Sequence, residues 1–276
     1  MQQAALAAGW RVSATGSAGD LAFADRAAVL AALASATHVL SSVPPVPEGG
    51  DPVLDAYGDA LGSATLAYLS STGVYGDTGG AWVDESAPVQ PGRRPARVVA
   101  DAAWLTLGAR VLRLPGIYGP GRSAIERVLE GRAHRVDMPG QVFSRVHVAD
   151  IASGVMAAFA GPPGAYNLAD DLPASGNAVI EEACRLLGRA PPPLLPLDQA
   201  GLSPQARAFY AQNRRVANGR ARRLLGWRPL YPGYRSGLGA CLTASGCCIG
   251  ASRPRSATTS PTSASPAPVM ASPDQR

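Results

Sequence analysis

The sequence predicts an α/β fold in which helices cover both faces of a parallel sheet. Short apolar segments of strand length alternate with longer helical segments along most of the 276 residues. Apolar side chains make up 46% of the chain and charged ones 16%, so a sizeable core is available and global disorder is excluded. The strand "AYLSS" is followed directly by threonine and glycine, as at the carboxyl end of a parallel strand that faces a ligand crevice.

The helical segments are rich in alanine or leucine, and several stop at glycine, as the first does at Gly9. They are expected at residues 2–9, 26–36, 52–62, 96–108, 123–131, 147–161, 177–188 and within 215–229. The strand segments are apolar and are bounded by turn-forming residues, as where "THVLSSVPP" ends in two prolines. They are expected at 10–15, 37–45, 65–70, 109–119 and 165–171.

The two ends of the chain depart from this plan. A doubly wound fold ordinarily begins with a strand and a glycine-rich turn before its first helix, whereas this chain opens in the helix. "ATGSAG" follows the second strand instead, so we expect the first strand and phosphate loop to be missing. Residues 239–276 are rich in Ser, Thr, Pro and Ala without any period, and we expect a disordered tail there.

Charge and cysteine usage exclude several classes of function. The net charge of +5 comes from arginine alone, since there is no lysine, and it is too scattered to indicate a nucleic-acid partner. The four cysteines and three histidines show no spacing typical of a metal site or a disulfide framework, so no metal is expected. No apolar run could span a membrane and no secretory signal opens the chain, which predicts a cytoplasmic protein without a membrane partner.

Five motifs in order resemble the extended short-chain dehydrogenase/reductase superfamily, in its NAD-dependent epimerase/dehydratase group. They are "YLSSTGVYGD", "VDESAPVQP", "LRLPGIYGPGR", "RVHVADIASGV" and "AYNLADD". The resemblance covers residues 1–238 and implies a Rossmann-like doubly wound parallel sheet with a small C-terminal substrate lobe at about 164–235. It also implies an NAD(P) cofactor and hydride transfer. The closest match is an atypical branch with an unconventional active site.

The hydroxyl run after the strand supplies the first catalytic candidate. In the resembling superfamily the strand-end hydroxyl four residues before the tyrosine of "VYG" binds the substrate oxygen, which here is Ser71. A hydroxyl both donates and accepts hydrogen bonds, so it suits a carbonyl or an alcohol. The alternative is an ordinary polar strand end that satisfies backbone groups. Tyr75, from the same motif, is a second catalytic candidate, although such tyrosines more often shape the pocket.

The superfamily's catalytic tyrosine and lysine, four residues apart on one helix face, have no counterpart here. Aligning "RVVADAA" with the lysine-led segment puts Arg97 at the lysine position and Arg93 at the tyrosine position. Arg97 could keep the cationic role toward the nicotinamide ribose, and Arg93 is a candidate for binding the substrate. Guanidinium does not deprotonate in proteins, so Arg93 cannot be a general base. A solvated helix start with loose arginines is the alternative.

The remaining candidates follow from the resembling loops. Cofactor contacts are expected from Thr15, Ser17, Ser42, Val43, Pro44, Leu114, Pro115, Gly116 and Ile117. Because no acid ends the second strand at Thr15–Ser17 to bind a ribose 2′-hydroxyl, NADP is favoured over NAD. Tyr118 and Arg145 are the substrate-binding candidates, Arg145 because it could hold an anionic group. His147 is expected to pack at a helix start.

The leading prediction is an NAD(P)-dependent oxidoreductase or epimerase/dehydratase-like enzyme. It would act by hydride transfer on a small carbonyl or alcohol, or on a sugar nucleotide. The alternatives are a nucleotide-binding pseudoenzyme, which the missing Tyr/Lys pair favours, and a truncated gene product that binds nothing. The expected partner is a small-molecule substrate, and if the chain self-associates we expect a homodimer through the helices at 52–62 and 96–108.

Overall fold

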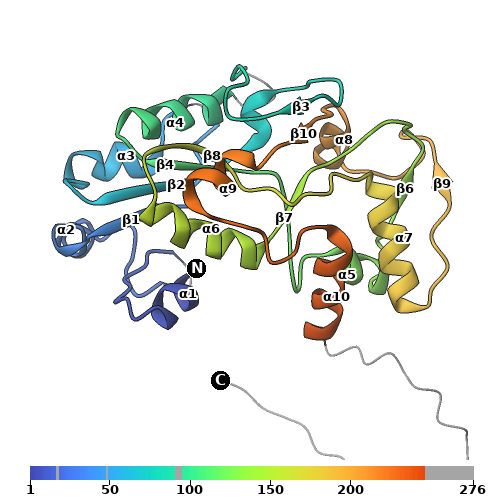
Figure 1. Cartoon of the computed structure of the whole chain (residues 1–276), viewed down its shortest axis with the longest axis horizontal. Helices are drawn as coiled ribbons and strands as arrows, with labels where there is room; N and C mark the ends of the chain where they lie inside the picture. Colours follow the sequence, from blue (N-terminus) through green and yellow to red (C-terminus); the bar gives the residue numbers. More distant parts are fainter. Residues whose placement is uncertain (17–18, 48, 91–94, 246–276) are drawn as a thin grey trace, which may run out of the picture.

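The computed structural model (Figure 1) describes residues 1–16, 19–47, 49–90 and 95–245. Its centre is a parallel sheet in the order β1-β2-β4-β8. The strands are β1 (His38–Ser41), β2 (Thr65–Ser71), β4 (Arg110–Leu114) and β8 (Gly164–Asn167). Helices lie on both sides of this sheet, so the predicted doubly wound α/β fold is confirmed.

The two central strands are buried on both faces, as parallel strands between helical layers must be. Successive side chains of a strand point to opposite faces. Tyr68 therefore packs with α4 (Pro95–Thr106), whereas Leu69, one residue on, packs with α6 (Val148–Ala160). On the α4 side Trp104 stacks on Tyr68, with ring centroids 5.3 Å apart. The helix α3 (Pro52–Tyr57) and the single turn η1 (Gly58–Ala60) complete that layer.

The N-terminal segment differs from the prediction. Helices α1 (Gln2–Ala7) and α2 (Arg26–Ser35) form as expected, but residues 10–15 are not a strand. They make only an isolated bridge, from Thr15 to Leu21, and pair with none of the described strands. Trp10 instead packs against His38 of β1 and Phe159 of α6, with ring centroids 4.4 and 5.7 Å apart.

A second lobe is built from α5 (Ala124–Leu129), α7 (Gly176–Leu187) and α10 (Tyr234–Ala244), which share one apolar core. The short strands β6 (Arg135–Val136) and β9 (Leu194–Leu195) pair beside α7. This lobe is not the predicted stretch 164–235, because β8 at its start belongs to the central sheet and the lobe also takes α5 and α10 from outside it. The reason is that the apolar face of each helix in this lobe packs against helices that are distant in sequence.

The C-terminal boundary also differs from the prediction. Helix α10 continues to Ala244, past residue 239 where the tail was expected to begin. Leu238, Cys241 and Leu242 are spaced along one helix face and are buried against α5 and α7. The serine- and threonine-rich composition of this stretch hid that apolar face. Residues 246–276 lie outside the described part of the chain.

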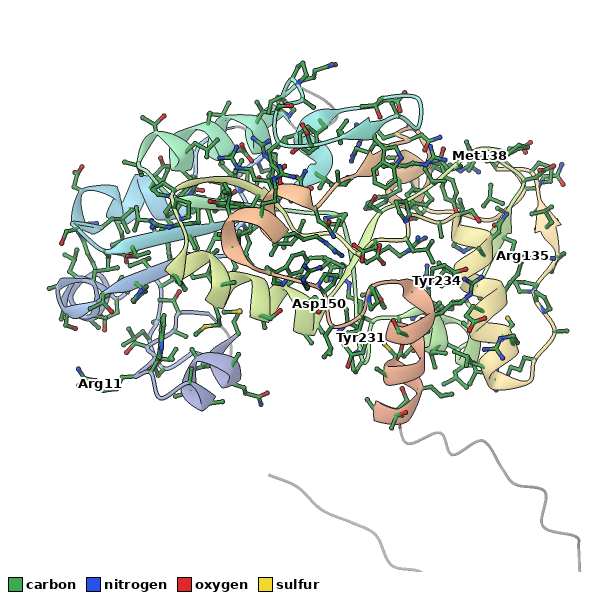
Figure 2. All side chains as sticks on the ribbon, in the orientation of Figure 1. Arg11, Arg135, Met138, Asp150, Tyr231 and Tyr234 are labelled. Atoms are coloured by element: carbon green, nitrogen blue, oxygen red, sulfur yellow. The ribbon has the colours of Figure 1, made fainter. Side chains whose placement is uncertain are left out.

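Smaller elements connect the two lobes. They are η2 (Thr72–Tyr75), the pairs β5 (Gly116–Tyr118) with β7 (Arg145–His147) and β3 (Trp82–Val83) with β10 (Arg215–Val216), and the helices α8 (Pro204–Tyr210) and α9 (Gly219–Leu225). Asp150, in the first turn of α6, accepts backbone N–H bonds from Leu230 and Tyr231 at 2.6 and 3.2 Å (Figure 2). This carboxylate fixes the path of the chain into α10.

No helix in the described ranges is long and apolar enough to cross a membrane.

Candidate functional site

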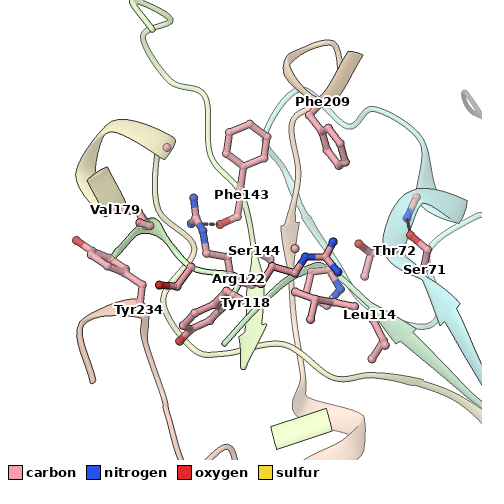
Figure 3. Close-up of a pocket in the computed structure, with 18 of the residues that line it drawn as sticks. Ser71, Thr72, Leu114, Tyr118, Arg122, Phe143, Ser144, Val179, Phe209 and Tyr234 are labelled. Carbon is pink, nitrogen blue, oxygen red and sulfur yellow. Dashed lines mark hydrogen bonds between the residues drawn. The ribbon is translucent and has the colours of Figure 1, made fainter. Parts of the chain in front are cut away.

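A cavity of about 1040 Å³ opens where the carboxyl ends of β1, β2 and β4 meet the second lobe. Ser71, the last residue of β2, is directly opposite Leu114, the last residue of β4, in the parallel register. Both line the cavity, together with the turn at 115–118. In Figure 3, Ser71 and Thr72 lie on one side of this pocket and Val179 and Tyr234 on the other. The prediction that Ser71 and the 114–118 turn share one cleft is therefore confirmed.

Ser71 is oriented by the turn that follows it. Its Oγ accepts a hydrogen bond from the Gly73 N–H at 3.1 Å and caps the 3-10 turn η2. Because the oxygen accepts this bond, the hydroxyl proton remains available to donate into the pocket. The half-buried Ser71 is followed by Thr72, which also lines the cavity and is buried. Sequence reasoning did not single out Thr72, although it stands in the same hydroxyl run.

A buried polar network lies behind this strand end. Asp101 of α4 accepts hydrogen bonds from Ser70 Oγ at 2.6 Å and from Arg113 of β4 at 2.7 and 3.1 Å. Arg113 also donates to the Tyr75 hydroxyl at 3.1 Å, and that hydroxyl donates to Asn167 of β8 at 2.8 Å. The network joins three strands of the sheet to α4 directly beneath Ser71.

Tyr75, a predicted catalytic residue, belongs to this network and does not line the pocket. Its side chain is 1% exposed, and both its donor and its acceptor capacity are used. Burial raises the pKa of the Tyr75 phenol, although the nearby Arg113 acts in the opposite direction. The arrangement gives Tyr75 a structural role in holding η2 against the sheet.

Arg97 lies in the pocket wall as predicted for a cation near the cofactor. One terminal nitrogen donates to the Tyr68 hydroxyl at 3.3 Å, and its buried Nε has no hydrogen-bond partner in the described structure. Arg93 falls outside the described residues. Tyr118, which also lines the pocket, has a buried hydroxyl without a partner, and burial raises the pKa of that phenol. A raised pKa makes Tyr118 a poor proton acceptor near neutral pH.

The predicted cofactor residues divide into two groups. Ser42, Pro44 and residues 114–117 line the cavity, whereas Val43 does not. Thr15 lies at an exposed bridge away from the cavity, and Ser17 is outside the described residues. The residues present fit the nicotinamide side of a dinucleotide, since Arg97 and Ser71 line one pocket beside the Pro115–Gly116 turn.

Arg145, predicted to bind an anionic group, lines the opposite end of the pocket. Its terminal nitrogens donate to the backbone carbonyls of Phe143 and Ala174, both at 2.8 Å, and of Ser175 at 3.4 Å. Burial lowers the pKa of Arg145 to about 10. Its donors are thus occupied by three neutral acceptors that hold the loop around 143–145 against the loop before α7.

Several pocket residues were missed by the sequence analysis. The most prominent are Arg127 of α5, His134, Phe143 and Tyr210 of α8. Each comes from the second lobe, whose position over the sheet depends on contacts between distant segments. "AIERVLEGR" reads as an ordinary charged surface helix, and nothing local marks Arg127 as facing a cavity. No group of His, Cys, Asp and Glu suited to hold a metal ion occurs among the residues described.

Comparisons with known proteins agree with this architecture. No protein-family model matches the chain. A solved structure of a functionally unknown conserved protein from Silicibacter pomeroyi DSS is 41% identical, with a TM-score of 0.77 over 87% of this chain and 93% of that one. A protein from Methylobacillus flagellatus, named as an NAD-dependent epimerase/dehydratase, is 27% identical, with a TM-score of 0.56 over 72% of this chain and 71% of that one.

A curated relative has a named reaction. The 3-diazoavenalumate denitrifying reductase of a Streptomyces species is 33% identical over 179 residues, which are 57% of this chain. The match spans 58% of the relative's own length.

Proposed function

This chain belongs to the extended short-chain dehydrogenase/reductase superfamily, and on that premise we propose that it is an NAD(P)-dependent reductase of a small substrate. The observation that supports this most directly is the placement of Ser71, Arg97 and the 114–117 turn around one cavity at the carboxyl edge of the sheet. When bound there, the reduced nicotinamide supplies a hydride. The residues described below bind and orient the two reactants.

Ser71 is proposed to bind the substrate atom that gains the proton. Its oxygen is held by the Gly73 N–H, so its own proton points to the open side of the pocket. There it polarises a carbonyl or a similar acceptor while the carbon atom receives the hydride. A proton relayed from water then neutralises the negative charge that develops on the acceptor atom. The overall balance is one hydride and one proton added across the substrate double bond.

Reduction is favoured over epimerisation or dehydration by the chemistry at residues 93 and 97. Those other reactions begin by removing a proton from the substrate alcohol, and guanidinium groups cannot accept it. Reduction needs a proton donor instead, which a hydroxyl with access to water supplies. The name of the Streptomyces relative, a reductase, supports the same direction. Arg97, which lines the pocket, would stabilise the ribose side of the nicotinamide through its positive charge.

NADP remains the proposed form of the cofactor. This rests on the sequence resemblance, in which the segment at Thr15 carries no carboxylate for the ribose 2′-hydroxyl, and not on the cavity, which Thr15 does not line. Ser42 and Pro44 would contact the far ribose and phosphates from the end of β1. The 114–117 turn would pack against the nicotinamide amide side.

The proposal is tested by titrating the full chain with NADPH and NADH, followed by turnover on carbonyl substrates. We expect NADPH to bind more tightly than NADH. Ser71→Ala should keep its NADPH affinity within about twofold and lose at least about 100-fold in kcat, as expected for one polarising donor. The control is Ser63→Ala, an exposed serine outside the pocket, which should keep wild-type turnover. Equal turnover in both variants would remove Ser71 from the mechanism.

A nucleotide-binding protein without turnover is the second candidate. It is favoured by the arginines at 93 and 97, where the superfamily carries its tyrosine and lysine. NADPH binding by the full chain without oxidation of NADPH over a broad panel of carbonyl and nucleotide-sugar substrates would select this candidate.

A further inference from the structure

The lobe side of the pocket holds more positive charge than its neighbouring carboxylates balance. Arg127 on α5, His134 and Arg145 all line the cavity opposite Ser71. Burial lowers the pKa of Arg127 and of His134, and in each case a neighbouring arginine, Arg132 or Arg127, lowers it further. His134 is therefore neutral near pH 7, whereas the Arg127 charge also lowers the pKa of Arg145, so these two guanidinium groups repel each other.

The nearby carboxylates are committed elsewhere. Glu126 accepts hydrogen bonds from the backbone N–H groups of Gly121 and Ser123 and from the Ser123 hydroxyl, in the capping box of α5. Glu130 pairs with Arg132 on the exposed rim. Asp170 is buried behind Arg145 and does not line the cavity. No carboxylate of the described residues thus lies within ion-pair distance of Arg127.

Arg127 differs from its neighbours in having its donors unused. Arg145 donates to three backbone carbonyls, and Arg132 is paired with Glu130. The side chain of Arg127 makes no hydrogen bond and no ion pair within the described part of the chain, although desolvation by nearby protein atoms lowers its pKa. By accessible surface Arg127 is an exposed residue, and it lines the cavity. A planar fork of donors in such a pocket matches an oxyanion.

Two aromatic rings line the same cavity as Arg127, and the Arg145 guanidinium lies over one of them, 5.8 Å from the centroid of the Phe143 ring. Phe143 and Tyr210 meet edge to face with ring centroids 5.5 Å apart, and both line the cavity. Tyr210 is also close enough to Arg127 for the guanidinium charge to lower the pKa of its phenol, against the larger raising effect of burial. In Figure 3 the Phe143 ring projects into the upper part of the pocket, between Tyr234 and Ser71. Flat apolar surface next to an unpaired cation suits a ring that carries an anionic group.

We propose that the pocket takes an aromatic substrate whose oxyanion group, a carboxylate or a phosphate, is bound by Arg127, with its ring against Phe143 and Tyr210. The reacting end of the molecule then extends toward Ser71 at the sheet. This inference rests on the proposed function for the reaction itself, but the anion site stands on the cavity and can be measured without turnover. Arg127 is a specificity-determining residue in this assignment.

The experiment measures binding to the full chain by calorimetry with and without NADPH. The probes are trans-cinnamate, its neutral amide trans-cinnamamide, and phenyl phosphate. We expect at least one anion to bind about tenfold or more tightly than the amide, and Arg127→Gln to abolish that preference. Arg185→Gln is the matched control, because Arg185 is an exposed helix residue paired with Glu182 outside the cavity, and it should keep the preference.

The two anions distinguish the sources of the oxyanion. Tighter binding of trans-cinnamate assigns the site to a carboxylate, and tighter binding of phenyl phosphate assigns it to a phosphate ester. Equal affinities for anions and amide, or a preference that persists in Arg127→Gln, would overturn the proposal. So would a tenfold loss of NADPH affinity in Arg127→Gln with unchanged anion binding, since Arg127 would then serve the cofactor. Failure of NADPH to bind at all counts against the proposed function and leaves the anion measurement intact.

Discussion

Two polar clusters lie on opposite sides of the pocket, and they differ in how completely they are paired. Under the sheet, Asp101, Arg113, Ser70, Tyr75 and Asn167 form a network in which the hydroxyls and charged groups find partners. At the lobe side, Arg145 donates only to neutral acceptors, and one buried oxygen of Asp170 and the buried Tyr118 hydroxyl have no partner among the described residues. The exposed side chain of Arg127 makes no hydrogen bond there either.

The difference separates residues that hold the fold from residues that await a ligand. A satisfied buried network rigidifies a core, and removing one member leaves the others unpaired. An unsatisfied one costs free energy in the empty protein, and this cost is recovered only when something binds or a proton is taken up. The sheet cluster therefore predicts losses of stability on mutation, whereas the lobe cluster predicts effects of pH and of ligand.

The largest effect is expected from Asp101→Asn. Asp101 and Arg113 are each about 3% exposed or less, and the change leaves the Arg113 charge buried without its counter-ion. We expect the free energy of unfolding, measured by urea denaturation, to fall by roughly 3 kcal/mol. Glu130→Gln, which breaks the exposed pair with Arg132, should cost less than about 1 kcal/mol.

A second variant tests the same prediction if Asp101→Asn prevents folding. The double variant Asp101→Leu/Arg113→Met removes both charges and should be more stable than Asp101→Asn. An Asp101→Asn protein as stable as the wild type would show that the sheet network does not contribute the stability assigned to it.

An intermediate effect is expected from the pH dependence of Asp170. Burial raises the pKa of Asp170 to about 7, even though Arg145 acts to lower it and Asp150 and Asp171 add to the rise. The folded state therefore binds a proton that the unfolded chain has already lost between about pH 4 and pH 7, so this group's contribution to stability falls as the pH rises. From pH 5 to pH 8 the fall is on the order of 2 kcal/mol.

Asp170→Asn tests this contribution directly. An amide stays neutral at both pH values, so the variant should show a smaller drop in Tm between pH 5 and pH 8 than the wild type does. Asp171→Asn, the exposed neighbour that pairs with Arg222, is the control for losing a carboxylate in the same loop. An unchanged pH difference in Asp170→Asn would mean that Asp170 is ionised throughout this range.

The sheet side was largely predictable from sequence, and the comparison of the clusters shows why. Ser71 and the 114–118 turn come at the ends of adjacent parallel strands, so strand order alone brings them together. Segment 10–15 was predicted as a strand from its composition, but a strand also needs a neighbour with which to pair, and that information is not local.

The lobe side was predictable only in part. Arg145 was identified beside its motif, but its hydrogen bonds to the loop before α7 involve residues about 30 positions away. Tyr75 was assigned to chemistry from the same motif as Ser71, whereas its partner Asn167 lies 92 residues further along. Arg127 carries no local signal at all, since a charged residue on a short amphipathic helix usually faces solvent. Which residues of the second lobe can bind a ligand depends on which helix faces point into the cavity, and that is set only in the folded lobe.

The smallest effect is also the one that separates the two clusters most sharply. Arg127→Gln removes a cation from a group of like charges, so we expect the free energy of unfolding at low salt to stay level or to rise by about 0.5 kcal/mol, since solvent in the pocket screens much of the repulsion. The gain should disappear in 0.5 M NaCl if repulsion causes it. A loss of more than about 1 kcal/mol would place Arg127 with Asp101 among the residues that hold the fold. If Arg127 serves to bind a ligand, the Arg127→Gln variant must keep its stability and lose its anion binding.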